Sequence, residues 1–197
     1  MCGRFYIEVD KSKLDEIVSE VEANLPDDED IISIKMEGEI FPTNIVPVQT
    51  AEGIRAMRWG FPMSRKDVIN ARSETVMEKP MFRTAMLERR CLVIATGYYE
   101  WKTEPIGPKT KYEFFSQGSD LIHIAGCFRR DKEAPGLAFV LLTRDATPEF
   151  APIHHRMPVV LDDAQAREWL SADADISRLI AESVTNLEHQ PTTVRRV

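Results

Sequence analysis

The sequence opens with M-C-G-R-F, so a cysteine directly follows the initiator methionine. A residue as small as cysteine normally allows Met1 to be removed, which would leave Cys2 with a free α-amine and a free thiol on adjacent carbons. Such a 1,2-aminothiol reacts with an aldehyde twice, because the amine condenses to a Schiff base and the thiol then closes a thiazolidine ring. An α-amine has a pKa of only about 8, so roughly a tenth of it is unprotonated near neutral pH. Position alone also allows Cys2 to be a small apolar residue of the core.

Three polar residues that can assist this chemistry lie in short motifs. Asn70 lies in INARSET, Glu100 in GYYEW and His154 in IHHRMP. Forming a Schiff base removes water from a carbinolamine, and this step needs a group that gives and takes a proton near pH 7. Histidine does so at its ordinary pKa, and burial can raise the pKa of a glutamate into the same range. Ordinary structural roles stay open, such as a turn hydrogen bond for Asn70 or a strand-end carboxylate for Glu100.

The elements that must position these residues can be predicted from hydrophobic periodicity. A helical spacing follows a capping residue at Asp10 or Ser12, with apolar residues at Leu14, Ile17, Val18, Val21 and Leu25. Runs rich in β-branched and aromatic residues predict strands in RFYIEV, CLVIATGYYEW, KYEFFS, LIHIAGCFR and LAFVLLTRDA. Later in the chain, DDAQAREWLSA and SRLIAESV are typical of helices.

A weakly helical pattern at 73–87 is interrupted by Pro80. The sequence contains no repeat and no linker long enough to divide domains. We therefore predict an α/β (α+β) fold, as a single domain over residues 1–197. Its core is expected to be a curved, mostly antiparallel β-sheet or barrel-like structure with flanking helices.

Composition excludes several classes of protein. The 197 residues are 43% hydrophobic and 29% charged, which is typical of a globular chain with its own core. No apolar run approaches the ~20 residues of a membrane helix, and the start is charged instead of resembling a signal peptide. The three cysteines are far apart and form no C-x-x-C pair, so we expect neither disulfides nor a zinc site, and no metal or other cofactor. The expected location is the cytoplasm, in association with the nucleoid in a bacterium.

The formal charge of −7 is unevenly distributed along the chain. Residues 8–39 hold twelve acidic and three basic side chains, whereas residues 55–90 hold nine basic and four acidic ones. A globally acidic protein can still present a basic surface to a polyanion, because binding depends on the local field. From composition alone, the same arginines could also be ordinary solvated surface.

Seven segments together identify a family. In chain order they are MCGRF, WGF, INARSET, MFR, RRCLVIATGYYEW, TRDA and IHHRMPVVL. In this order, and over nearly the whole chain, the sequence resembles the SOS response-associated peptidase (SRAP) family. The resemblance implies a sensor of abasic sites in single-stranded DNA, which links to the ring-opened sugar through its N-terminal cysteine. The resulting thiazolidine would shield the lesion from strand cleavage, and a self-processing peptidase activity would release Met1.

The resemblance also implies a role for each candidate residue. Cys2 would be the nucleophile, and Asn70 would orient the sugar or the Cys2 terminus. Glu100 would act as acid and base, while His154, chosen over His155 by the H-x-R-M-P spacing, would assist ring opening and reversal. The expected DNA contacts are phosphate binding by four arginines and base stacking by two aromatic residues: Arg4, Arg72, Arg83, Arg156, Trp59 and Phe61. For the two aromatic residues a place in the core is an equal alternative.

Two other hypotheses use the same residues. In the first, the chain is an N-terminal nucleophile hydrolase in which Cys2 attacks a peptide or another amide. In the second, it is a module that binds single-stranded DNA without covalent chemistry, and Cys2 is incidental. The expected partner is single-stranded DNA containing abasic sites, with no membrane partner, and the expected state is a monomer.

Overall fold

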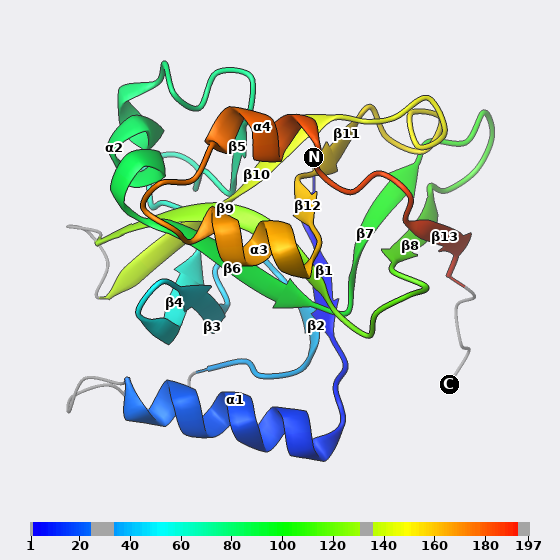
Figure 1. Ribbon diagram of the computed structural model, residues 1–197. Helices are drawn as coiled ribbons and strands as arrows, with labels where there is room; N and C mark the ends of the chain where they lie inside the picture. The colour runs from blue at the N-terminus through cyan, green and yellow to red at the C-terminus, as the bar shows by residue number, and fades with distance from the viewer. Residues whose placement is uncertain (1, 25–33, 131–135, 193–197) are drawn as a thin grey trace.

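The computed structural model describes residues 2–24, 34–130 and 136–192. At its centre is a closed barrel of five strands: β3 (Ile45–Thr50), β4 (Gly53–Trp59), β6 (Arg90–Ala95), β9 (Ile122–Arg130) and β10 (Leu137–Asp145). The hydrogen-bonded order β4–β3–β6–β9–β10 returns to β4, and Figure 1 shows these strands in the middle of the molecule. The β10–β4 pairing is parallel and the other pairings in the ring are antiparallel.

A second, antiparallel sheet stands beside the barrel. Its strands, in spatial order, are β13 (Glu188–Pro191), β8 (Thr110–Phe115), β7 (Gly97–Lys102), β1 (Phe5–Ile7) and β2 (Gly38–Ile40). Only Thr96 separates β6 from β7, so an almost continuous strand passes from the barrel into this sheet. At the crossing, a Cβ added to Gly97 would lie 2.3 Å from the Phe114 carbonyl oxygen and 2.6 Å from the Tyr6 hydroxyl. The crossing therefore requires glycine.

Three short strands extend the barrel sheet and carry residues of the site. β5 (Asn70–Arg72) pairs in parallel with β10, β11 (Arg156–Pro158) pairs antiparallel with β10, and β12 (Val160–Leu161) pairs with β9. Within these pairings, Asn70 lies opposite Leu141 and Arg156 lies opposite Asp145. One strand, β10, thus brings together two motifs that are distant in the sequence.

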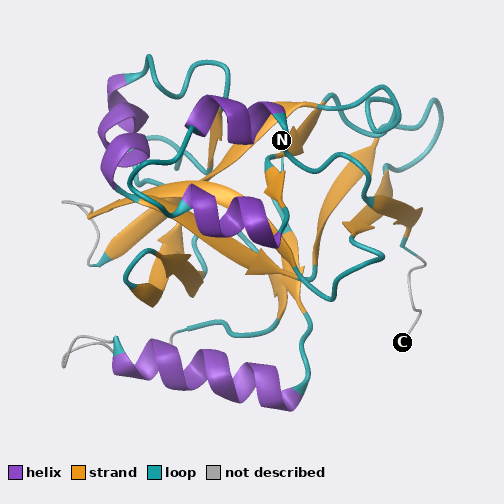
Figure 2. Cartoon of the chain, in the orientation of Figure 1, coloured by secondary structure: helices purple, strands orange, loops and turns teal. Residues whose placement is uncertain are grey.

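The helices of the described chain lie around the strands, as Figure 2 shows: α1 (Lys11–Ala23), α2 (Pro80–Glu88), α3 (Asp163–Trp169) and α4 (Ile176–Ala181). In Figure 1, α1 lies at the bottom of the view, and α2 and α4 lie at the top. Ile17 and Val21 of α1 are buried in one cluster with Ile54 of β4. Asp10 caps α1, because its carboxylate accepts the Lys13 N–H at 2.8 Å.

The observed architecture confirms the predicted α/β fold around a curved, mostly antiparallel, barrel-like core. Pro80 departs from expectation. It is the first residue of α2 and does not interrupt a helix, because the first helical position needs no N–H donor. No helix in the described ranges is long and apolar enough to cross a lipid bilayer.

Candidate active site

Cys2 is completely buried, in a core cluster at the junction of the barrel and the second sheet. The segment that leads into β1 runs beside β7, where the Tyr99 N–H donates to the Arg4 carbonyl oxygen at 2.9 Å. The Cys2 thiol makes a longer contact of 3.7 Å with the same carbonyl oxygen. Burial raises the pKa of the thiol far above its usual value, and the charge of Glu100 raises it further. The sulfur is therefore held as a neutral thiol.

Asn70 fixes the backbone of Cys2. Its Nδ2 donates to the Cys2 carbonyl oxygen at 2.8 Å. The residue before it is itself held in place, because the Ile69 carbonyl oxygen accepts from Trp59 Nε1 at 3.0 Å and from the Leu141 N–H at 3.2 Å. The Oδ1 atom of Asn70 is buried and has no hydrogen-bond partner among the described residues. The side chain thus holds Cys2 with one atom and offers an acceptor with the other.

Glu100 and His154 form a pair whose pKa values are shifted in opposite directions by burial. Glu100 is 4% exposed, and its Oε1 lies 3.9 Å from Nδ1 of His154. Burial raises the pKa of Glu100 to about 7 and lowers that of His154 below its ordinary value. Near neutral pH the pair therefore holds a neutral imidazole beside a carboxyl group that titrates in the same pH range. Such a pair can both give and take a proton.

The backbone of Arg156 holds the His154 ring. Nδ1 accepts the Arg156 N–H at 3.0 Å when the proton of the neutral ring is on Nε2. The same nitrogen lies 3.1 Å from the Arg156 carbonyl oxygen and donates a hydrogen bond to it in the other neutral tautomer, which leaves Nε2 free to take a proton. His155 stacks on this ring with centroids 4.5 Å apart, but it is exposed. The geometry therefore favours His154 as the residue that works with Glu100.

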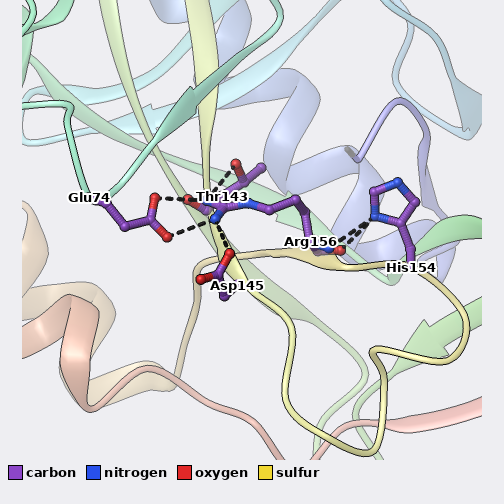
Figure 3. Close-up of polar contacts among 5 residues, drawn as sticks. All are labelled: Glu74, Thr143, Asp145, His154 and Arg156. Atoms are coloured by element: carbon purple, nitrogen blue, oxygen red, sulfur yellow. Dashed lines mark hydrogen bonds and ion pairs between the residues drawn. The ribbon is translucent and has the colours of Figure 1, made fainter.

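The guanidinium of Arg156 is buried in an ion-pair network (Figure 3). It donates to the two carboxylate oxygens of Glu74 at 2.7 and 2.9 Å, to Asp145 at 2.5 Å and to the Thr143 carbonyl oxygen at 2.6 Å. The sequence predicted that Arg156 binds a DNA phosphate. In this structure the guanidinium is buried and already bound by carboxylates and a carbonyl oxygen of the protein, so it is not open to a phosphate. Arg156 instead holds β11, and with it the neighbouring His154, against β10.

We expect Arg156→Met to lower the free energy of unfolding by about 2–3 kcal/mol, because several charge-assisted hydrogen bonds are lost while their carboxylates remain partly solvated. Urea unfolding measures the change. The matched control is Arg72→Met on the exposed end of β5, which should stay within about 0.5 kcal/mol of the parent. Equal effects of the two substitutions would show that the network has no special structural role.

The other three arginines differ in how accessible they are. Arg72 ends β5, two residues beyond Asn70, and is exposed, as is Arg83 on α2. The Arg4 guanidinium donates to Glu39 at 3.0 Å and lies over the rings of two neighbouring residues, Phe41 and Trp101. Arg72 and Arg83 are therefore available to phosphates as they stand, and Arg4 is shared with a carboxylate.

Trp59 and Phe61 are fully buried, which overturns the expectation that they stack on exposed bases. The Trp59 ring lies in the core, 5.0 Å from the Phe5 ring, and its indole nitrogen fixes the residue before Asn70. The Phe61 ring packs with Phe82 of α2 in a separate cluster. Both aromatic residues belong to the core, and Trp59 supports the site because it holds the backbone next to Asn70.

The motifs indicate no role for Glu74 or Asp145, although each residue stands in one of them. Glu74 follows Arg72 in INARSET, and Asp145 follows Arg144 in TRDA. Each motif contains a carboxylate that could pair with a buried arginine. Neither motif indicates that the two carboxylates meet around Arg156. Within the described ranges, no three His, Cys, Asp or Glu side chains are placed to hold a metal ion.

The protein thus combines a barrel-based α/β fold with a buried Cys2 that Asn70 holds, close to the pair of Glu100 and His154. The same architecture occurs in a solved protein from Bacteroides thetaiotaomicron, with a TM-score of 0.76, 20% identity and coverage of 98% of this chain and 93% of that one. The family model described as SOS response associated peptidase (SRAP) matches residues 1–197, and the chain belongs to this family. The family resemblance of the motifs is confirmed.

Curated relatives have names that concern DNA lesions. The chain is 32% identical over 195 residues to abasic site processing protein YoqW of Bacillus subtilis, which covers 87% of this chain and 80% of the relative. It is 31% identical over 195 residues to abasic site processing protein YobE of the same organism, with coverage of 87% and 82%. These names support abasic-site processing as an activity within the family.

Proposed function

We propose that this chain recognises abasic sites in single-stranded DNA and links to them covalently through Cys2. The observation that carries the proposal is the environment of Cys2. Asn70 holds its backbone, and the charge of Glu100 acts on its thiol. Burial raises the pKa of this Glu100 carboxyl to about 7. An aminothiol that reacts with an aldehyde needs such a proton donor and acceptor. The names of the relatives support an abasic sugar as the source of that aldehyde.

The proposed reaction releases one water. His154 takes the proton of the hemiacetal hydroxyl and returns one to the ring oxygen, which opens the sugar to its aldehyde. The Cys2 α-amine adds to the aldehyde carbon, and one of its protons passes to the aldehyde oxygen, which becomes the carbinolamine hydroxyl. The protonated Glu100 carboxyl then gives its proton to this hydroxyl, which departs as water and leaves a protonated Schiff base. The thiol sulfur then adds to the same carbon and passes its proton to the Glu100 carboxylate, so that the thiazolidine closes and Glu100 is restored.

This reaction requires the removal of Met1, because the attacking amine must belong to Cys2. Residue 1, on which the expectation of self-processing falls, lies outside the described residues. The family description as a peptidase supports processing by the chain itself. The exposed arginines Arg72 and Arg83 are proposed to bind phosphates on the strand that carries the lesion.

The proposal is tested by incubating the purified protein with a single-stranded oligonucleotide that carries one abasic site. We expect a band that survives denaturation, and an intact mass equal to the protein without Met1 plus the DNA minus one water. The control is the same oligonucleotide with an intact base, which should give no such band.

Other outcomes would favour the rival hypotheses. Salt-sensitive DNA binding without an adduct, on protein that has lost Met1, would indicate a non-covalent binding module. Release of an amine from a peptide or amide substrate, without an adduct on abasic DNA, would indicate the N-terminal nucleophile hydrolase. Either result would refute the proposed covalent function.

A further inference from the structure

Strand β7 presents two neighbouring tyrosines to opposite sides of its sheet. Side chains alternate along a strand, so Tyr98 shares a face with Glu100, and Tyr99 lies on the other face. Lys111 Nζ lies 3.6 Å from the centre of the Tyr99 ring on that outer face. Tyr98 points inward and is 1% exposed, and its ring stacks on Phe114 with centroids 4.7 Å apart.

The Tyr98 hydroxyl is buried and has no hydrogen-bond partner among the described residues. Its ring alone would serve the packing, because phenylalanine offers the same face to Phe114. A buried hydroxyl without a partner costs free energy and is uncommon in folded proteins. The hydroxyl is therefore available as a hydrogen-bonding group to a substrate that enters the site.

The reacting groups are the neighbours of this hydroxyl. Tyr98 and Cys2 belong to the same buried cluster, and Glu100 follows two positions along the same face of β7. Burial raises the pKa of the Tyr98 hydroxyl, and the charge of Glu100 raises it further. The hydroxyl is thus a neutral donor at every pH at which the site works. Asn70 Oδ1, also buried and without a partner, supplies an acceptor to the same site.

We propose that Tyr98 is a further residue that contacts the substrate: its hydroxyl donates a hydrogen bond to the aldehyde oxygen of the ring-opened sugar. That oxygen becomes the carbinolamine hydroxyl that Glu100 protonates, so the two donors on one face of β7 act on the same atom. Tyr98 keeps this oxygen oriented while the Cys2 amine attacks the carbon that bears it. This inference rests on the proposed covalent function.

The test compares Tyr98→Phe with Tyr99→Phe, the same substitution at the next residue on the opposite face. With abasic single-stranded DNA at saturation, we expect Tyr98→Phe to form the adduct about tenfold more slowly, as the loss of one oriented hydrogen bond predicts. Its Tm should not fall, because the variant loses a hydroxyl that has no partner in the free protein. Tyr99→Phe should form the adduct at the parent rate.

Three results would overturn the inference. The first is a Tyr98→Phe variant that forms the adduct at the parent rate, which would show that the hydroxyl does not act on the substrate. The second is a slower rate of adduct formation that is accompanied by a lower Tm, which would make Tyr98 a packing residue. The third is a parent protein that forms no adduct at all, which alone of the three would also refute the proposed function.

Discussion

Replacing Cys2 with alanine should abolish the covalent product. The yield of adduct should fall at least about a hundredfold, to the detection limit of the assay. The variant keeps an N-terminal amine, so it can still form a reversible Schiff base, but it has no sulfur to close the ring. Denaturing gels after incubation with abasic single-stranded DNA measure the loss. DNA binding should persist, because the exposed arginines Arg72 and Arg83 are unchanged.

Two further variants sharpen this experiment. Cys127→Ala removes a thiol that is equally buried but lies in a different core cluster, and it should leave adduct formation intact. Cys2→Ser keeps the amine and replaces sulfur with a weaker nucleophile, so its product should survive denaturation only after reduction of the Schiff base with borohydride. A stable, unreduced adduct on Cys2→Ala would place the link on another residue and contradict the proposal.

Replacing Glu100 with glutamine should slow adduct formation by about a hundredfold or more, because the amide keeps the shape of the carboxyl but cannot transfer a proton. In the parent protein, the rate should change near pH 7, where Glu100 titrates. The variant should lose that feature of the pH profile. A variant whose profile still bends at the same pH would show that another group performs the proton transfer.

The same substitution should change stability in a direction that depends on pH. The pKa of Glu100 is raised from 4.5 to about 7 in the folded protein, so between these values the folded state holds a proton that the unfolded state has lost. The parent therefore loses stability as the pH rises through this interval, whereas Glu100→Gln does not. In urea unfolding, the variant should gain about 2–3 kcal/mol on the parent between pH 5 and pH 8. A constant difference would mean that the carboxyl is not buried in solution.

Local patterns in the sequence predicted the elements well, because local interactions determine them. Asp10 caps α1, and the apolar spacing of this helix places Ile17 and Val21 in the core. The closure of the barrel was not predictable in this way. It depends on β10, which pairs with β4, β5, β9 and β11 at once, and none of these pairings leaves a periodic signal in a single strand.

The candidate site was predictable as a set of motifs but not as a set of environments. Arg72 and Arg156 both lie beside proposed catalytic residues in the sequence, yet one is exposed and the other is buried. The difference arises because Glu74 and Asp145, from two separate segments, meet around Arg156. The motif around Trp59 likewise indicated that this residue lies near the site. It could not indicate that the ring points into the core, because its burial depends on the closed barrel.

The dependence of the site on β10 also sets the order in which its parts emerge during synthesis. Cys2 leaves the ribosome before the other site residues, because β5, which carries Asn70, comes some 70 residues after it, and β10 and His154 follow still later. A nascent chain therefore displays its thiol long before β10 can close the barrel, and such non-local pairings form slowly. Until then, the cysteine has neither its proton donor nor the apolar cover that keeps it neutral. The newly made chain is thus the form most vulnerable to adventitious oxidation or alkylation, and folding itself ends that exposure.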